Sequence, residues 1–334
     1  MLLKAASICT LIRTFAVNMM MKKAFLFVLG TWLTLAVHAQ ESQEVYSFLR
    51  LPVSAHAAAL GGDNVTITDN DPTFIFHNPA LIANVTDKSL NLNYMTYMEG
   101  ARTASASFVR KAKDRAYWGV SGQFMDYGSM KEMTADNIQT GEFSARDVAL
   151  AGTFTYLLGH QISGGITARF ISSTIGQFSS AAVAVDLGLN YNNPEKGLSV
   201  SAVAKNLGGQ IAAYQDEFEP IPLDLQVGVT KRLIGSPLRI SATFSRLNRW
   251  DEGLGKHLAV GADLILSDNI YLAAGYNFRR ASEMKITDDE GEASHGAGLS
   301  LGGGIQLQRF KLQVGYAKYH VSASSLLVNL TYTL

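Results

Sequence analysis

From residue 89 to its last residue, the chain is a series of segments in which apolar and polar side chains alternate. In the final segment, SLLVNLTYTL, Leu326 and Val328 fall on one face and Asn329 on the other. A period of two is that of a β-strand, whose successive side chains point to opposite faces. About 14 such segments follow one another, each near the 9–11 residues with which a tilted strand crosses a bilayer. The clearest are 90–97, 116–124, 147–156, 162–170, 182–191, 223–230, 238–244, 310–316 and 325–334, and the weaker ones are 103–110, 198–206, 256–266, 270–279 and 295–307.

The connections between these segments alternate strictly between shorter and longer. A membrane barrel predicts this, because tight turns lie at one rim and longer loops at the other. A soluble β-sandwich gives no reason for such alternation, and a propeller or solenoid would show an internal repeat, which the sequence lacks. Short connections are expected at 111–115, 158–161, 192–197, 234–237, 267–269 and 308–309, intermediate ones at 97–102, 174–179 and 319–323, and long polar ones at 126–142, 207–222, 247–255 and 280–294.

A final strand with an unpaired edge would expose N–H and C=O groups that lipid cannot satisfy. We therefore expect this strand to pair with the first one, near residues 90–97, and to close the sheet. The predicted fold is all-β: a closed antiparallel transmembrane β-barrel of about 14 strands with an N-terminal plug. Its apolar faces would meet lipid, and four tyrosines that end apolar runs are expected in the interfacial aromatic girdles: Tyr156, Tyr191, Tyr316 and Tyr332.

The start of the chain carries the pattern of a secretory signal peptide. Lys22 and Lys23 form a basic region, an apolar run follows, and the small-x-small motif VHA ends at Ala39. A membrane anchor helix is the alternative, although the apolar run is short for one. Cleavage is expected near Ala39.

Three parts of the chain follow from these patterns. Residues 1–39 are predicted to be an upstream extension and signal peptide, residues 40–88 a plug or hatch, and residues 89–334 the barrel. The true start is either Met1 or Met21, and we expect Met21. The single cysteine lies in the first part, so the mature chain needs no disulfide.

The segment 40–88 has few strand-like stretches. Its small-residue run SAHAAALGG predicts a short helix ended by Gly61 and Gly62. Asn78 and Pro79 are a turn signal, with Pro79 placed to open a helical turn. A barrel of 14 strands would otherwise hold an open channel, so we expect this segment inside the lumen.

Here the sequence resembles a known family. The pattern AAALGG…D…FHNPALIA is similar to the N-terminal hatch of the FadL-like outer-membrane barrels, which have 14 strands and a short plug with an Asn-Pro-Ala turn. Asn78, Pro79 and Ala80 match that turn, with Gly61 and Gly62 upstream. More closely, stretches such as FHNPALIANV, FSARDVALAGTFTY, VSAVAKNLGGQI and PLDLQVGVTKRL resemble the PorQ family, FadL-related barrels of the type IX secretion system.

This resemblance implies a non-enzymatic barrel of the Gram-negative outer membrane that belongs to a cell-surface attachment complex. Its implied partners are a PorZ-like surface protein, which it would anchor, a PorU-like sortase and a PorV-like barrel, as well as outer-membrane lipid. The alternative is a FadL-type channel for hydrophobic small molecules, whose sign would be a kinked strand with an apolar pocket behind it. Lysine plus arginine and aspartate plus glutamate both number 28, and this balance gives no indication of nucleic-acid binding.

Other chemistries find little support in the residue pattern. The histidines at 56, 77, 160, 257, 295 and 320 show no metal-ligand spacing, and no cofactor or metal is expected. The glycine-rich stretch 296–304 continues a strand and opens no helix, unlike a phosphate-binding loop. No G-x-S-x-G motif is present, but an outer-membrane hydrolase stays a third alternative, because catalytic triads need no local motif.

Charged residues on the polar strand faces are expected to lie in the lumen. They would mainly satisfy one another and the plug, and a charged lumen that selects a solute is the alternative. His77 and Asn78 would either hold their turn or contact a ligand. The acidic loop stretches DEFEP and ITDDEGEASH are expected to be either docking surfaces for a surface partner or solvated loop tips, and the sequence favours neither. The charged lumen positions are Asp147, Arg169, Asp186, Lys205, Asp224, Arg239, Asp263 and Lys311.

Overall fold

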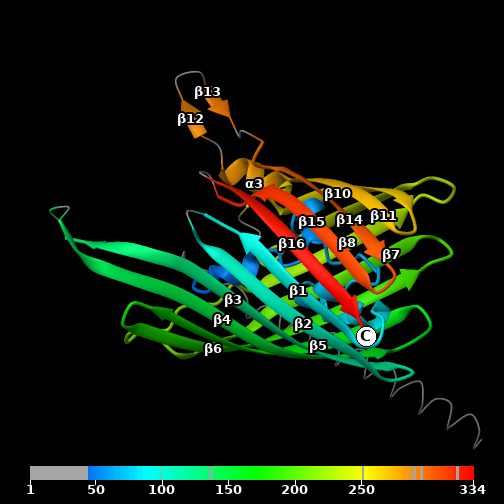
Figure 1. The fold of residues 1–334 in the computed structure, drawn as a ribbon, viewed down its shortest axis with the longest axis horizontal. Helices are drawn as coiled ribbons and strands as arrows, with labels where there is room; N and C mark the ends of the chain where they lie inside the picture. The colour runs from blue at the N-terminus through cyan, green and yellow to red at the C-terminus, as the bar shows by residue number, and fades with distance from the viewer. Residues whose placement is uncertain are drawn as a thin grey trace, which may run out of the picture. The chain divides into compact units, whose positions relative to one another are not determined.

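The computed structural model describes residues 44–334 except 99, 135, 137, 250–251, 285, 289–290, 294–295 and 321–322. Within these residues, fourteen strands form a closed antiparallel barrel (Figure 1). The predictions for the extension and signal peptide lie outside the described residues. The barrel strands are β1 (Ser89–Thr96), β2 (Arg102–Lys113), β3 (Ala116–Met133), β4 (Gln139–Leu157), β5 (Ile162–Ile175), β6 (Phe178–Asn193), β7 (Leu198–Ala212), β8 (Asp224–Arg232), β9 (Leu238–Phe244), β10 (Leu258–Ser267), β11 (Ile270–Asn277), β14 (Leu299–Leu307), β15 (Phe310–Lys318) and β16 (Ser324–Thr333).

The last strand closes the barrel against the first. β16 runs antiparallel to β1, with Leu92 opposite Leu330 and Tyr94 opposite Val328, and pairs on its other edge with β15. The predicted closure is thus confirmed, and every wall strand has a partner on both sides. Among the described residues, no helix has the length and apolar character to cross a membrane.

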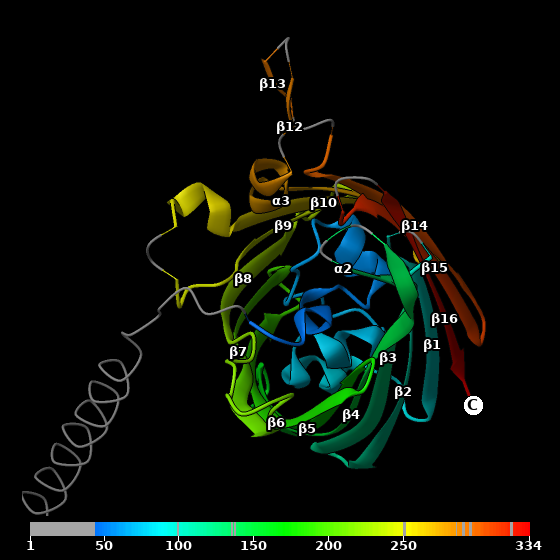
Figure 2. The ribbon, with the colours of Figure 1, turned by 90° about the vertical axis from the view of Figure 1, so that its left-hand side faces the viewer.

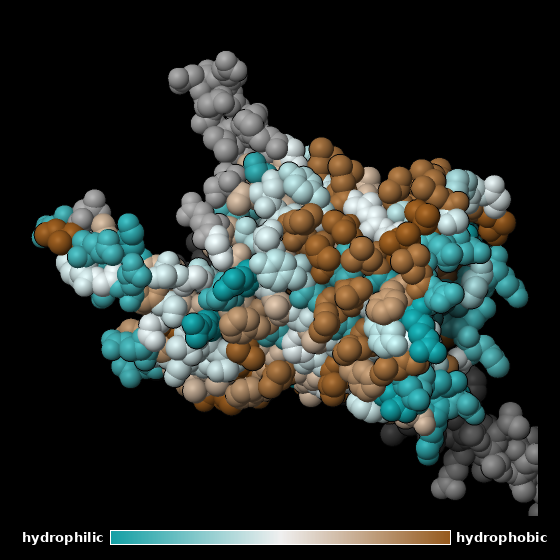
Figure 3. Space-filling view, in the orientation of Figure 1, coloured by the Kyte–Doolittle hydropathy of each residue, from teal (hydrophilic) through white to brown (hydrophobic). Residues whose placement is uncertain are grey.

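The outer face of the wall is apolar. Leu92, Leu150 and Leu301 are each more than half exposed, while polar residues that alternate with the apolar ones, such as Asn91 and Asn93, are buried. In Figure 3, apolar side chains gather over the middle of the strands and polar ones over the protruding ends. A contiguous apolar surface of this extent is stable in lipid rather than in water.

The strands β3 and β4 continue well beyond the wall, which corrects one sequence prediction. Residues 126–142 were expected to form a long polar loop, but β3 reaches Met133 and β4 begins at Gln139. Neither β2 nor β5 follows them, because the β2 pairing stops at Asp126 and the β5 pairing at Ala145. We call residues 127–144 the ribbon; in Figure 1 it projects far from the barrel.

Other long connections also contain regular structure. Residues 280–294 include most of α3 (Phe278–Glu283) and the hairpin of β12 (Ile286–Asp288) and β13 (Gly291–Ala293). The short helix η4 (Leu254–His257) ends the connection between β9 and β10. These elements lie at the same rim as the ribbon, and the opposite rim has tight turns (Figure 1).

The segment before β1 lies within the barrel (Figure 2). It consists of η1 (Ser47–Arg50), α2 (Ala55–Ala59), η2 (Pro72–Phe76) and η3 (Pro79–Asn84), joined by irregular chain. Phe74, Leu81 and Ile67 are buried together against Leu60 of the same segment and Ala273 of β11. The plug thus has a small apolar core of its own, which the small and polar lumen side chains of the wall could not supply.

Candidate functional site

The Asn-Pro-Ala turn fixes the plug to the wall. Asn78 caps η3, because its Oδ1 accepts a hydrogen bond from the Ala80 backbone N at 2.9 Å, and Pro79 is the first residue of the helical turn. The carbonyl of Pro79 accepts from Thr155 Oγ1 at 2.6 Å, and that of Ala80 accepts from Ser163 Oγ at 3.0 Å. The turn therefore carries hydrogen bonds from two neighbouring strands, β4 and β5.

Two wall glycines make room for this turn. A Cβ on Gly165 would lie 2.6 Å from the carbonyl carbon of Pro79. One on Gly188 would lie 2.9 Å from Pro79 Cδ and well inside van der Waals contact with Asn78 Oδ1. Only glycine lets the plug backbone approach β5 and β6 so closely.

Gly61 and Gly62 lie at the opposite wall, just past the end of α2. Both have φ of +103°, which glycine adopts without steric cost. The carbonyl of Gly61 accepts from Asn277 Nδ2 at 2.9 Å, which ties the plug to the end of β11. The five predicted motif residues thus occupy two separate anchor points, one on β4–β6 and one on β11.

A buried ionic network links the plug to the wall between these anchors. Arg239 of β9 donates to both carboxylate oxygens of Asp69 in the plug, at 2.7 and 2.9 Å, and to Asp263 of β10 at 2.7 Å. Asp263 also pairs with His56 of α2 at 2.8 Å, and the His56 ring stacks on Tyr271. Burial acts to raise the pKa of Asp69, but the charge and hydrogen bonds of Arg239 outweigh it and hold that pKa well below its usual range.

Most predicted lumen charges are compensated as expected. Besides the Arg239 network, Arg169 pairs with Asp186 at 2.6 Å, and Lys311 lies 3.8 Å from Asp71 of the plug. Asp147 accepts from Tyr127 at 2.7 Å. Lys205 is the exception, since its ammonium group forms neither a hydrogen bond nor an ion pair within the described part of the chain, whereas Asp147 and Asp224 at least accept hydrogen bonds.

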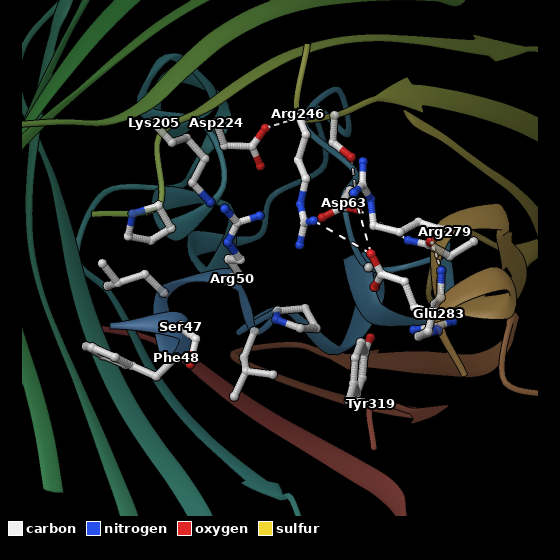
Figure 4. A pocket seen from close by; sticks show the side chains of 18 of the residues that line it. Ser47, Phe48, Arg50, Asp63, Lys205, Asp224, Arg246, Arg279, Glu283 and Tyr319 are labelled. Carbon is white, nitrogen blue, oxygen red and sulfur yellow. Dashed lines mark hydrogen bonds and ion pairs between the residues drawn. The ribbon is translucent and has the colours of Figure 1, made fainter. Parts of the chain in front are cut away.

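A cavity of about 300 Å³ lies between η1 of the plug and the rim that carries the long loops (Figure 4). One side is apolar, with Phe48, Met98 and Met125. The other side is charged and includes Lys205 and Arg246. The cavity is therefore amphipathic.

The wall is broken beside this cavity. β8 pairs with β7 only as far as Lys205 opposite Asp224, while β7 continues to Ala212 against β6 alone. The register between β6 and β7 shifts at this point, and Asn206 has a φ of +58°, which is uncommon for a residue other than glycine. β7 is thus kinked, and its edge toward β8 is unpaired beyond the kink.

Arg169 and Asp186 hold the kink in place. Asp186 Oδ1 accepts from the Asn206 backbone N at 2.7 Å, and Arg169 donates to Asn206 Oδ1 at 2.8 Å. Asn206 Nδ2 in turn donates to the carbonyl of Pro222 at 2.9 Å, in the connection that covers the break. Four buried polar groups thus lock a short stretch of irregular backbone in the wall.

Apolar surface lies directly outside the kink. A groove of about 660 Å³ on the lipid face is bordered by Leu150, Phe170, Val183 and Leu207. Arg169 borders this groove and also a small inner space of about 20 Å³, which shares Lys205 with the large cavity. A space of 20 Å³ holds about one water molecule, so the passage between cavity and groove is closed here.

His77 of the plug is buried and has a structural role in its surroundings. His77 accepts a long hydrogen bond from the Ser54 backbone N at 3.4 Å; burial, together with the charge of Lys205, lowers the pKa of His77 well below its usual range. Among the described residues, no group of three or more histidine, cysteine or acidic side chains is arranged to hold a metal ion. His295 lies outside the described residues.

The fold and the site together define a class: a plugged 14-strand membrane barrel with a kinked strand beside an internal cavity. No protein-family model matches the chain, and no curated protein is similar in sequence.

Solved structures of the same fold include aromatic hydrocarbon channels. The toluene transporter TodX of Pseudomonas putida has a TM-score of 0.54 and 14% identity, over 87% of this chain and 97% of that one. The toluene transporter TbuX of Ralstonia pickettii has a TM-score of 0.52 and 12% identity, over 84% and 96%. The monoaromatic hydrocarbon channel CymD has a TM-score of 0.55 and 13% identity, over 85% and 97%. At these identities the similarity establishes the fold, and it gives no support to a role in type IX secretion.

Proposed function

We propose that this protein is an outer-membrane channel of the FadL type, which carries small hydrophobic or amphipathic molecules from the long-loop rim into the lumen and then sideways into the membrane. The sequence suggested this function as the alternative to surface attachment. The kinked strand with apolar surface behind it, expected of such a channel, is the observation that carries the proposal. The shared fold with aromatic hydrocarbon channels supports it.

The proposed route follows from the closed lumen. Straight passage along the barrel axis is blocked, because the plug is held by hydrogen bonds from side-chain hydroxyls of β4 and β5 and by the Arg239 network on β9 and β10. The wall beside Asn206 lacks one strand pairing, so it needs the fewest broken hydrogen bonds to open. Displacement of the Arg169 side chain would join the inner space to the outer groove.

Filling the outer groove tests this route. Gly152 lies in the groove and faces lipid, and a Cβ there would meet nothing within 4 Å, so Gly152→Phe adds bulk without a clash. Gly159→Phe is the matched control, since Gly159 lies in a tight turn and its Cβ would also meet nothing within 4 Å. The readout is the initial rate of radiolabelled toluene uptake by bacterial cells that produce each variant in the outer membrane.

We expect the unchanged protein to raise toluene uptake above that of cells without it, Gly152→Phe to reduce this increment severalfold, and Gly159→Phe to preserve it. Equal uptake with Gly152→Phe and with Gly159→Phe would exclude the lateral route. If cells with the unchanged protein take up toluene no faster than cells without it, the protein is not a channel for toluene.

Anchoring of a surface partner is the second candidate function, and the ribbon is the observation that favours it. Within the part of the chain that the structure describes, neither ribbon edge has a strand partner, and free edges accept a strand from another protein. Met133 and Ile138 near the tip are about half exposed or more, so the tip also offers apolar contact area. The partner implied by the sequence resemblance is a PorZ-like surface protein.

Shortening the ribbon tests this second candidate. A two-residue turn in place of residues 128–143 removes the free edges and leaves the wall pairings of β3 and β4 intact. A parallel deletion of the β12–β13 hairpin is the control. If the ribbon is the docking element, only its deletion will abolish recovery of a surface protein with the barrel from gently solubilised membranes; unchanged recovery would remove the ribbon from consideration.

A further inference from the structure

The charged side of the internal cavity gathers cations from four parts of the chain. Five basic residues line it against three acidic ones (Figure 4). The basic residues come from η1, β7, the connection after β9, and α3. The basic set is Arg50, Lys205, Arg246, Arg279 and Arg280, and the acidic set is Asp63, Asp224 and Glu283.

Several of these cationic groups have donors without acceptors. Arg50 Nη1, Arg279 Nη2 and Arg280 Nη1 are buried and make no hydrogen bond within the described residues. Arg279 and Arg280 are only 6% and 5% exposed. Buried donors of this kind are rare in native proteins, and each requires an explanation. Arg50 and Arg279 pair with Glu44 and Glu252 through their other terminal nitrogens, so these three nitrogens are the donors that the surroundings of the cavity leave without an acceptor.

The residues around Arg280 hold its guanidinium group without supplying an acceptor for its Nη1. It donates to the carbonyls of Ala297 at 2.8 Å and Gly298 at 3.0 Å, and its guanidinium stacks over the Tyr319 ring at 4.7 Å. All of these partners are neutral. They hold the guanidinium in place and leave its positive charge uncompensated.

The acidic residues of the cavity are largely occupied elsewhere. Asp224 accepts from the backbone N of Arg246 at 2.6 Å and from Gln226 at 2.7 Å, and Asp63 accepts from Asn277 at 3.2 Å. Glu283 is shared between Arg246 at 3.8 Å and Arg279 at 3.6 Å. The acidic residues thus do not satisfy the unpaired guanidinium nitrogens.

The basic residues also repel one another. Arg246 lies in the connection after β9, outside the wall strands, and burial, followed by the charges of Arg50 and Arg279, lowers its pKa. In Figure 4 the side chains of Lys205, Arg50 and Arg246 lie next to one another along the cavity. A bound anion at this point would relieve their repulsion and accept from their free N–H groups.

We propose that this cavity is a binding site for a tetrahedral oxyanion of the phosphate class, held by Arg50, Lys205 and Arg246, with Arg279 and Arg280 completing its surroundings. Donors that arrive from several elements suit an anion whose acceptors point in several directions, whereas a carboxylate accepts mainly in one plane. The cavity volume of about 300 Å³ leaves room for a small substituent on the phosphate. The site does not depend on transport through the wall.

Titration calorimetry on the full-length protein in a phosphate-free, non-ionic detergent tests the site. The probes are inorganic phosphate, a short-chain phosphatidic acid and benzoate. We expect saturable binding of phosphate that Arg246→Gln weakens about tenfold or more, because one charge-assisted pair is lost. Arg110→Gln is the matched control, because Arg110 pairs with Asp87 and does not line the cavity.

The probes separate the sources of the phosphate group. Binding of both phosphate probes supports a free or substituted phosphate as ligand, and binding of phosphatidic acid alone, lost in Arg246→Gln, supports a lipid headgroup. Benzoate bound as tightly as phosphate would overturn the assignment, as would the absence of saturable binding or an equal effect of the two arginine substitutions. In unheated gel samples, a band whose mobility changes on heating is that of the folded barrel. Each variant that retains this band is folded.

Discussion

Gly188 supports the plug anchor, and replacing it with alanine should loosen the plug without opening the barrel. The added methyl group would collide with Asn78 Oδ1 and lie 2.9 Å from Pro79 Cδ. Neither neighbour is a flexible chain end, because Asn78 also donates to the carbonyl of Val65 at 3.0 Å and Pro79 is a ring. The turn must therefore shift as a unit.

The cost can be estimated from the contacts that such a shift strains. Overpacking of a buried site costs about 1–3 kcal/mol. Loss of the Asn78 cap of η3 adds about 1 kcal/mol. A total of about 3 kcal/mol would raise the population of the detached plug about 100-fold, since about 1.4 kcal/mol corresponds to a factor of ten.

Hydrogen–deuterium exchange measured by mass spectrometry reports this population. Peptides from residues 64–84 should exchange about 100-fold faster in Gly188→Ala, while peptides from β14 to β16 stay protected. Gly152→Ala is the control, because its methyl group points into open space on the lipid face. Identical exchange of the plug in both variants would show that close approach to β6 does not hold it.

Three further predictions concern the ionic network and the closing strand. Arg239→Met should destabilise the plugged barrel by about 3–5 kcal/mol, because Asp69 and Asp263 both lose a partner at a mostly buried site. Arg110→Met breaks only the partly exposed pair with Asp87 and should cost at most about 1 kcal/mol. The two variants are compared by the temperature at which the gel band of the folded barrel is lost. The pKa of Asp69 is depressed in the folded protein, so its contribution to stability is complete above its unfolded pKa of about 3.9 and is lost as the pH falls through the folded value. The protection factor of the plug amides, which is the intrinsic exchange rate at each pH divided by the observed rate, should therefore be constant from pH 7 to about 4 and fall below that. An unchanged protection factor in more acidic buffer would contradict this. Removal of residues 324–334 should abolish the barrel band, because β1 and β15 would both present open edges to lipid; a folded truncated barrel would show that closure is not required.

The wall could be predicted from the sequence because lipid and lumen impose opposite polarity on successive residues. The apolar Leu92 predicts the lipid face and the polar Asn93 the lumen face, and in the structure Leu92 is exposed and Asn93 is buried. Closure followed from the same reasoning, since an open final strand has no partner in a membrane.

The ribbon escaped that reasoning for a physical reason. No lipid-facing side imposes a period of two on the ribbon, so Lys131 and Glu132 follow one another between Met130 and Met133 without strict alternation. Its order comes from backbone hydrogen bonds between β3 and β4, which leave little trace in the side-chain pattern. The polar composition was therefore interpreted as a loop.

The site was predictable only in part. Asn78, Pro79 and Gly61 carry local turn signals, and the structure puts each at an anchor of the plug. Lys205 was expected to be compensated like the other lumen charges. Lys205 directly precedes the kink of β7, where Asp186 is taken by Arg169 and by the Asn206 backbone N, and no local spacing reports such a long-range arrangement.

Two contacts of the plug with distant strands set an order on assembly. The N-terminal segment leaves the ribosome first, yet Pro79 needs β4 and β5, and Ala55 needs Asn329 of β16, whose side chain receives its backbone N–H. The earliest part of the polypeptide therefore completes its contacts last, after the final strand has arrived. In a chain whose barrel has not closed, this segment lacks its contact with the final strand and stays open to proteases. Protease resistance of the segment therefore indicates that the barrel has closed.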